Sequence, residues 1–296
     1  MARPHDTAVL LDTHVHVWDP TRLDYLWLAG LPALDHPFLP AEVDRADGAT
    51  ARMVFVQADC RADQSLDEAH WVAGLAADWP ELAGIVAAAD LRSASLAEHL
   101  DALADIGGPD GTRLVRGIRH LLQGEPVEAF ADPALRRGLE LLAERGIPFD
   151  ACVVHPQLDA LADLLDAVPE LDVVLDHVGK PPVDAGLDSD AGRAWADALD
   201  RLADRPGTHV KLSGLAAEAS DRASLDAHAD AFLARALDAF GADRAMLGSD
   251  WPVSARLGAG GSFADWAARV RRVAEDGGHE WAAIAGGTGA RVYGLA

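Results

Sequence analysis

Residues 8–18 read AVLLDTHVHVW, a short apolar run that ends in two histidines two positions apart. A short apolar run of this kind is typical of a strand buried on both faces, as in a parallel sheet. Residues two apart in a strand share a face, so the imidazoles of His14 and His16 are expected to point into the same space. The stretch therefore predicts a buried strand over 8–13 with reactive side chains where it ends.

Seven similar segments follow along the chain, at 52–58, 83–89, 114–119, 147–154, 172–177, 208–213 and 244–249. Between them lie segments of helical period rich in Ala, Leu, Asp and Arg, at 133–145, 157–168, 190–203, 223–239 and 262–275. Pro133 at the expected start and Gly146 just past the expected end delimit one such helix. Eight strands alternating with helices predict either a parallel barrel or a doubly wound sheet.

The absence of a GxGxxG motif after the first strand disfavours a dinucleotide-binding sheet. The prediction is therefore a single α/β domain over residues 1–296, a (β/α)8 TIM barrel. Residues 17–50 form a loop too apolar for a disordered linker, and the glycine-rich loop 254–262 is a candidate lid. Residues 180–190 are interpreted as an ordinary loop.

The charge balance narrows the set of partners. The chain has 48 acidic and 25 basic residues and a net charge of −23, which repels phosphate backbones and disfavours nucleic acid. No apolar run approaches the ~20 residues that span a bilayer, and the N-terminus lacks the separate regions of a signal peptide, so we expect a cytoplasmic protein. Cys60 and Cys152 are expected to be buried small hydrophobes, not a disulfide or zinc ligands.

Barrel enzymes place their chemistry at the C-terminal ends of the strands. Polar side chains gather at those predicted ends: His14 and His16, Gln57, Arg119, His155, His177, Lys211 and Asp250. Two of them have a structural alternative, with Lys211 as a buried charge paired with Asp250 and Arg119 as an ion-pair partner. An isolated histidine is more often structural, and this interpretation is given to His5, His36, His70, His99, His120, His209, His228 and His279. The joint pattern at strands one, five, six and eight favours a functional site.

Several motifs in order resemble a known family. The HxH of strand one with the strand-eight aspartate resembles the amidohydrolase superfamily. The chain is more closely similar to its sugar-lactonase branch, which includes fuconolactonase-like, rhamnonolactonase-like and 2-pyrone-4,6-dicarboxylate lactonase-like enzymes. The motifs that carry this are THVHVWDP (13–20), DYLWL (24–28), GIRHLLQGEP (117–126), LDHVGKPP (175–182), KLSG (211–214), GSDWPV (248–253) and ARVYGL (290–295). The resemblance covers nearly the whole chain and implies a (β/α)8 fold and hydrolysis of a cyclic ester.

One position departs from that pattern. CVVHPQL carries His155 where many lactonase relatives are expected to have another residue, and a histidine before proline resembles a metal ligand of the related decarboxylase branch. The alternative function is therefore a metal-dependent nonoxidative decarboxylase. A catalytically inactive barrel that serves as a binding protein is a further alternative, disfavoured by the intact polar residues at most strand ends.

The resemblance implies roles for the site residues. In a metal-dependent version, His14, His16, His155 and Asp250 hold one divalent ion, Zn²⁺ or Mn²⁺, which suits three imidazoles and a carboxylate. In a metal-independent version the histidines polarise the carbonyl. In both, Asp250 activates water as general base, and His177 hydrogen-bonds the water or the developing oxyanion.

The expected partner is a small-molecule substrate, and both a monomer and a homo-oligomer remain open. Arg119 is the candidate for gripping a carboxylate or polar ring substituent, because its fork donates two hydrogen bonds. Tyr25, Trp27 and Trp251 are candidates for apolar walls with polar donors, and Gln57 for a further substrate contact. The alternative role of the aromatic residues is core packing.

Overall fold

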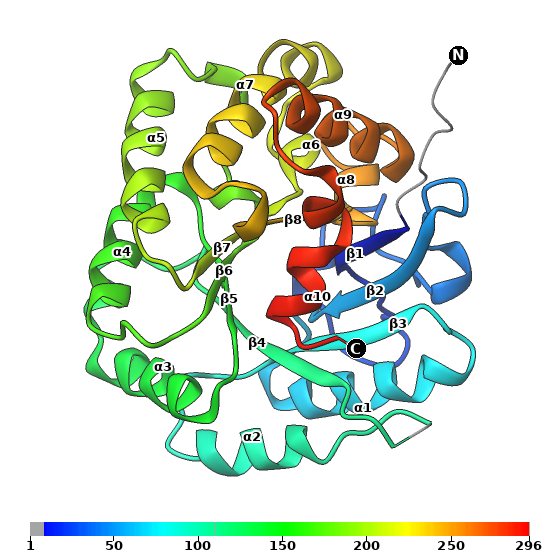
Figure 1. Cartoon of the computed structure of the whole chain (residues 1–296). Coiled ribbons are helices and arrows are strands. Elements are labelled where there is room, and N and C mark those ends of the chain that lie inside the picture. Colours follow the sequence, from blue (N-terminus) through cyan, green and yellow to red (C-terminus); the bar gives the residue numbers. More distant parts are fainter. Residues whose placement is uncertain (1–8, 110, 296) are drawn as a thin grey trace.

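The computed structural model describes residues 9–109 and 111–295. Eight parallel strands pair in chain order, and helices surround them (Figure 1). The strands are β1 (Leu10–Val15), β2 (Thr50–Val56), β3 (Leu82–Ala88), β4 (Val115–Leu121), β5 (Phe149–Cys152), β6 (Val173–Leu175), β7 (Thr208–Leu212) and β8 (Ala245–Leu247). Each of the eight predicted segments overlaps one of them. The predicted (β/α)8 barrel is confirmed.

The barrel closes between β1 and β8 just beyond the ends of the strands. The backbone N–H of His16 donates to the carbonyl of Trp251 at 2.8 Å, and that of Asp250 donates to the carbonyl of His14 at 2.8 Å. This β1–β8 seam therefore ties the HxH segment directly to the segment that carries Asp250.

A buried carboxylate reinforces the seam. Asp12 accepts hydrogen bonds from the backbone N–H of Ser249 at 2.9 Å, from its hydroxyl at 2.6 Å, and from the backbone N–H of His14 at 3.1 Å. Burial raises the pKa of Asp12 to about 7, although these hydrogen bonds act in the opposite direction. Asp12 thus joins the two strands where ladder hydrogen bonds are few.

The outer layer consists of helices that follow the strands from β2 onward. The longer ones are α1 (Ser65–Gly74), α2 (Leu96–Ala104), α3 (Pro133–Arg145), α4 (Leu158–Asp166), α5 (Asp190–Ala203), α7 (Arg222–Phe240) and α9 (Phe263–Asp276). The short ones are α6 (Leu215–Glu218), α8 (Val253–Arg256) and α10 (Thr288–Val292). Helix α3 has the predicted termini, because Asp132 caps the N–H of Ala134 and Gly146 ends the helix with φ 61°.

Two apolar clusters stabilise the barrel. The larger lies between the strands and the helices. The smaller contains Leu11, Val54, Val86, Val174 and Met246, which come from five different strands and pack around Tyr293. Since these strands lie on different sides of the barrel, the smaller cluster fills its interior, and the segment after α10 supplies the aromatic ring at its centre.

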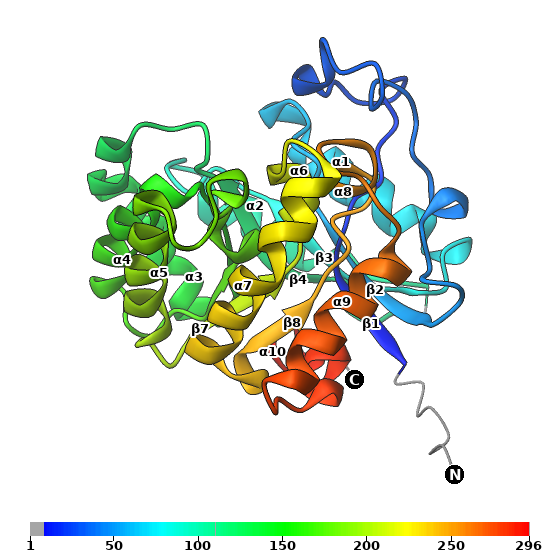
Figure 2. The same cartoon turned by 90° about the horizontal axis from the view of Figure 1, so that it is seen from above.

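The segment that connects β1 to β2 is well packed, as its apolar composition predicts. Trp18, Leu34 and Phe38 are fully buried, and the indole N–H of Trp18 donates to the carbonyls of Leu34 at 3.2 Å and His36 at 3.0 Å. Figure 2 shows this blue segment rising on the side of the barrel where α6 and α8 lie. It therefore contributes to the end of the barrel at which the strands terminate.

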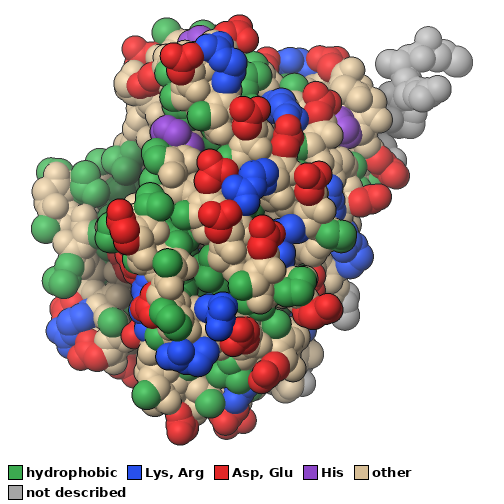
Figure 3. Space-filling model, turned by 90° about the vertical axis from the view of Figure 1, so that its left-hand side faces the viewer, with side chains coloured by type: hydrophobic (Ala, Val, Ile, Leu, Met, Phe, Trp, Pro, Cys, Tyr) green, Lys and Arg blue, Asp and Glu red, His purple; other side chains and the backbone are tan. Residues whose placement is uncertain are grey.

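The surface carries interspersed charges of both signs, as Figure 3 shows for one face. Ion pairs between neighbouring helices are part of this pattern: Arg201 in α5 contacts Asp159 at 2.9 Å and Asp163 at 2.7 Å in α4. Exposed pairs of this kind contribute about 0–1 kcal/mol each. The acidic residues of these pairs thus lie on solvated helix faces. Within the described residues, no helix is long and apolar enough to cross a membrane, and both cysteines are buried and free.

Candidate active site

The two histidines of β1 and its extension bring their Nε2 atoms within 3.1 Å of each other. His16 Nδ1 lies 2.7 Å from the carbonyl oxygen of Val56. Because a carbonyl only accepts, this nitrogen carries the proton, and His16 Nε2 is left with a lone pair. His14 Nδ1 lies 3.2 Å from Asp176 Oδ1, and burial lowers the pKa of His14 well below its ordinary value. Both imidazoles thus direct Nε2 toward one point.

Asp250 faces the same point from the β8 side of the seam. Its Oδ1 lies 3.6 Å from His16 Nε2, 3.7 Å from His177 Nε2 and 3.9 Å from His14 Nε2. Its Oδ2 accepts a hydrogen bond of 2.7 Å from the hydroxyl of Ser254. Burial alone would raise the pKa of Asp250, but its interactions with the three histidines outweigh burial and hold the pKa well below its usual range. The carboxylate is therefore ionised at neutral pH.

His177 completes the group. Its Nδ1 lies 3.0 Å from the hydroxyl of Ser213, so Nε2 is the atom that faces Asp250. Burial lowers the pKa of His177 to about 4, and the ring is neutral at pH 7. The ring packs against Gly214, where a Cβ would lie 2.5 Å from His177 Cγ and φ is +79°. Only glycine fits this position.

Metal-ligand atoms converge at this point. Among the described residues, His14, His16 and Asp250 offer two imidazole nitrogens and one carboxylate oxygen within 4.8 Å of one another. Two facing nitrogens and a low-pKa carboxylate suit a borderline divalent ion such as Zn²⁺ or Mn²⁺, with further positions open for water and substrate. The donor set therefore fits such an ion.

The structure places His155 elsewhere. This residue lies in a 3-10 turn beyond the end of β5, and its Nδ1 is 3.2 Å from the carbonyl oxygen of Lys180. It belongs to neither of the groups of potential metal ligands that the described residues form. His155 is thus not brought together with His14, His16 and Asp250.

A cleft of about 670 Å³ opens over the histidines, a volume suited to a small-molecule ligand. Charged, amide and aromatic side chains surround it. Its lining includes His16, Trp18, Trp27, Asp59, Arg119, Gln123, Cys152, His177, Lys180, Glu218 and Asp250. The cleft offers a polar floor, aromatic walls and groups of both charges.

Two of the five predicted substrate residues line this cleft. One is Trp27, whose indole N–H donates to the carbonyl of Ala58 at 2.8 Å. The other is Arg119, whose NH1 lies 3.2 Å from Asp176 Oδ2. The ion pair with Asp176 agrees with the structural alternative for Arg119. The guanidinium thus lies between the cleft and the buried carboxylate.

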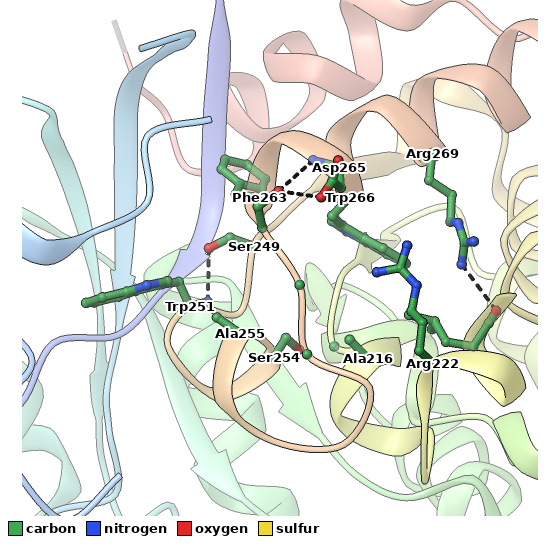
Figure 4. A pocket seen from close by; sticks show the side chains of 15 residues that line it. Ala216, Arg222, Ser249, Trp251, Ser254, Ala255, Phe263, Asp265, Trp266 and Arg269 are labelled. Carbon is green, nitrogen blue, oxygen red and sulfur yellow. Dashed lines mark hydrogen bonds between the residues drawn. The ribbon is translucent and has the colours of Figure 1, made fainter. Parts of the chain in front are cut away.

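The other three lie outside the lining of the cleft. Tyr25 is buried in the core, and Gln57 turns its Oε1 to the backbone N–H of Asp59 at 2.5 Å. Trp251 packs edge-on against Phe38 with ring centroids 5.4 Å apart. It lines a neighbouring cavity of about 520 Å³, in which Figure 4 shows it opposite two arginine side chains.

The structural alternative for Lys211, a buried charge paired with Asp250, is right about burial and wrong about the partner. Its Nζ lies 2.5 Å from Asp150 Oδ2 and 3.0 Å from Asp176 Oδ1, and all three side chains are fully buried. The hydroxyl of Tyr293 donates to the same oxygen of Asp150 at 2.8 Å. Lys211 thus neutralises two carboxylates inside the barrel, beneath His14.

Sequence reasoning missed several residues of the site. Lys180 falls in the loop that was interpreted as ordinary, yet it lines the cleft with Glu218 and Asp59. Its position three residues after His177 was an available signal. Asp12 was quoted within the first strand without a role, although it directly precedes the HxH segment.

The buried carboxyl group of Glu68, next to the cleft, should make the stability of the fold depend on pH. Its carboxylate is buried and accepts a hydrogen bond from the backbone N–H of Ala58 at 3.1 Å, and burial raises its pKa to about 7. At pH values between the ordinary pKa of a glutamate and 7, the folded state binds more protons at Glu68 than the unfolded state does. The contribution of Glu68 to stability therefore falls as pH rises. Relative to wild type, Glu68→Gln should gain up to about 3 kcal/mol in free energy of unfolding between pH 5 and pH 8. Urea unfolding at both pH values measures this, and a constant difference would contradict it.

Comparison with known proteins identifies the family. The amidohydrolase family model matches residues 11–295. An L-fucono-1,5-lactonase from Burkholderia multivorans is 36% identical over an alignment of 298 positions, which covers 97% of this chain and 97% of that enzyme. The crystal structure of an amidohydrolase from Burkholderia multivorans with bound zinc superimposes with a TM-score of 0.82 at 34% identity and covers 98% of this chain and 100% of that chain.

The decarboxylases are more distant. The structure of 5-carboxyvanillate decarboxylase from Sphingomonas paucimobilis covers 98% of this chain and 100% of its own, with a TM-score of 0.63 and 15% identity. This likeness extends to the fold alone. The match to the family model over nearly all of its length, together with the identity to the lactonase, shows that the chain belongs to the amidohydrolase family.

Proposed function

We propose that this protein hydrolyses the lactone of a sugar acid. The observation that carries the proposal is the ionised Asp250 carboxylate, whose Oδ1 faces three buried imidazoles at the floor of the cleft. The similarity to an L-fucono-1,5-lactonase supports the substrate class.

The walls of the cleft suit a small ring with several hydroxyls. Trp27, which is partly exposed, offers an aromatic face, and the buried Trp18 packs edge-on against it with ring centroids 5.3 Å apart. Asp59, Gln123 and Arg119 offer acceptors and donors on the same cleft. Aromatic faces pack against the C–H faces of sugars, and polar groups between them hydrogen-bond the hydroxyls.

Asp250 is the general base in this proposal. Its Oδ1 takes a proton from water as the oxygen attacks the carbonyl carbon, while the hydroxyl of Ser254 holds Oδ2 in place. His177 is neutral, and its Nε2 hydrogen-bonds the water or the developing oxyanion, with Ser213 fixing the ring. Catalysis by these groups follows from their common orientation toward one point.

A divalent ion fits the same floor. Zn²⁺ or Mn²⁺ held by His14, His16 and Asp250 would polarise the lactone carbonyl and lower the pKa of water. The zinc bound in the related amidohydrolase supports this assignment. His155 has no place in this ligand set, because its ring is engaged with Lys180.

The test is turnover of a substrate panel. Purified protein is offered aldonolactones, simple γ-lactones and pyrone dicarboxylates, and proton release is followed with a pH indicator. We expect rapid hydrolysis of an aldonolactone, well above the spontaneous rate. Inactivity across the panel would overturn the proposal. Metal analysis of the same protein, with one zinc ion per chain expected, tests the ligand set independently of turnover, and failure to bind zinc would overturn the metal assignment alone.

A further inference from the structure

A left-handed turn of the backbone follows β6. Four consecutive residues have positive φ: His177 at 53°, Val178 at 55°, Gly179 at 69° and Lys180 at 49°. The left-handed conformation is unfavourable for L-residues, and a β-branched valine adopts it rarely. Such outliers persist where the surroundings hold them, and they gather at functional sites. This turn brings both His177 and Lys180 to the wall of the cleft.

Three hydrogen bonds hold the turn. The indole N–H of Trp195 donates to the carbonyl of Val178 at 2.9 Å, and the backbone N–H of Lys180 donates to the carbonyl of His177 at 2.8 Å. His155 Nδ1 lies 3.2 Å from the carbonyl of Lys180, which only accepts, so the imidazole donates. His155, in the 3-10 turn after β5, therefore supports the backbone of Lys180.

The side chain of Lys180 reaches a carboxylate on the helix that follows the neighbouring strand β7. Its Nζ lies 3.3 Å from Glu218 Oε1 in α6, and the two side chains are 18% and 27% exposed. Burial lowers the pKa of Lys180, but the nearby Cys152, Glu218 and Asp250 more than offset burial and raise the pKa above its ordinary value. The ammonium group is therefore charged at neutral pH while it faces the cleft.

The chain's use of basic residues adds a second argument. Lys180 and Lys211 are the two lysines of the whole sequence, against 23 arginines. One lysine neutralises the buried carboxylates beneath His14, and the other lines the cleft. A guanidinium does not give up its proton in proteins, whereas an ammonium can. A lysine at this wall, in a chain that otherwise uses arginine, points to proton transfer.

We propose that Lys180 is the general acid that protonates the ring oxygen of the lactone, with Glu218 as its positioning residue. The proposal rests on the proposed function and assigns protonation of the leaving oxygen to Lys180 instead of to the proton that Asp250 takes from water. The ring oxygen of an aldonolactone leaves as an alkoxide, which is a strong base and a poor leaving group. A charged donor on the cleft wall removes this difficulty.

The proposed reaction consumes one water and returns Asp250 and Lys180 to their initial protonation states. Water adds its oxygen to the carbonyl carbon and gives one proton to Asp250. As the tetrahedral intermediate collapses, the electron pair of the ring C–O bond moves to the ring oxygen, which takes a proton from Lys180 Nζ. The resulting neutral amine regains the proton held by Asp250 through solvent. The product is a hydroxy acid, whose carboxyl group then releases its proton.

The experiment compares substrates that differ in leaving group. Wild type, Lys180→Met and Lys180→Arg are assayed on an aldonolactone, whose leaving group is an alcohol, and on a series that ends in dihydrocoumarin, whose leaving group is a phenol. Lys180→Met should lose about 10²- to 10⁴-fold in kcat on the aldonolactone and less than about tenfold on dihydrocoumarin. Lys180→Arg keeps the charge without a transferable proton and should show the same split. Glu218→Gln should give a smaller loss with the same dependence on leaving group.

Each other outcome decides against the proposal. Equal losses on all leaving groups would make Lys180 a binding residue, and recovery by arginine would make the charge alone sufficient. Unchanged kcat in Lys180→Met would remove it from the reaction. Thermal unfolding of the variants shows whether they are folded. If Lys180→Met does not fold, Lys180→Arg still tests the proposal, because its side chain can keep the ion pair with Glu218. Failure of the proposed function itself appears separately, as inactivity of the wild type on every lactone.

Discussion

Replacing Asp250 by Asn is expected to lower kcat between about 10²- and 10⁴-fold while the protein remains folded. The amide keeps the shape of the side chain and can still accept the hydrogen bond of Ser254, which lies 2.7 Å from Oδ2. It removes the negative charge that faces the three imidazoles, and with it the acceptor for the proton of water. Steady-state kinetics on the best lactone of the panel measures the loss.

Ser254→Ala is the matched control for this variant. It removes the hydrogen bond to Oδ2 but leaves the carboxylate ionised, so it should retain most of the turnover. Retention of more than about a tenth of the activity in Asp250→Asn would exclude the carboxylate as general base. Comparison of the two variants separates the charge of Asp250 from its orientation.

Lys211→Met is expected to lower the free energy of unfolding by about 3–5 kcal/mol. Methionine has a similar length and fits the apolar surroundings, but it leaves Asp150 and Asp176 without the ammonium that lies 2.5 Å and 3.0 Å from their oxygens. Two buried carboxylates without this partner are costly because burial disfavours the charged form. Urea unfolding measures the change.

The pH dependence of this variant supplies a further check. Burial raises the pKa of Asp150 to about 6 even with Lys211 present, and removal of the ammonium raises it further. Since the carboxyl can take up a proton at low pH, the deficit should be smaller at pH 5 than at pH 8. The double variant Lys211→Met with Asp150→Asn should recover part of the loss. A deficit below about 1 kcal/mol at pH 8 would contradict the assigned role.

The barrel was predictable because its strands are short apolar runs separated by helical segments. Periodicity finds such runs wherever burial on both faces dictates the residue types. The predicted ends of the strands were less accurate. The sixth was predicted to reach His177, but β6 ends at Leu175, and His177 is the first residue of the left-handed turn. Valine and lysine give no local sign of that conformation.

The candidate site was predictable in part. His14 and His16 share a face by strand alternation, and the seam brings Asp250 to them, so their proximity follows from closure of the barrel. His155 follows the last residue of β5 by three positions and lies in a 3-10 turn, where alternation no longer sets the direction of a side chain. The partners of Lys211 depend on the cross-section of the barrel, which local sequence does not encode.

The seam between β1 and β8 has a consequence for synthesis of the chain. Asp12 and Ser249 are 237 positions apart, so a ribosome must translate most of the described sequence before the first strand finds its last neighbour. Until then the nascent polypeptide carries an edge strand with unsatisfied backbone groups, a known template for aggregation. Contacts of such long range also slow folding. A chaperone that shields the emerging N-terminal half therefore has more time to act on this protein than on one whose sheet closes locally.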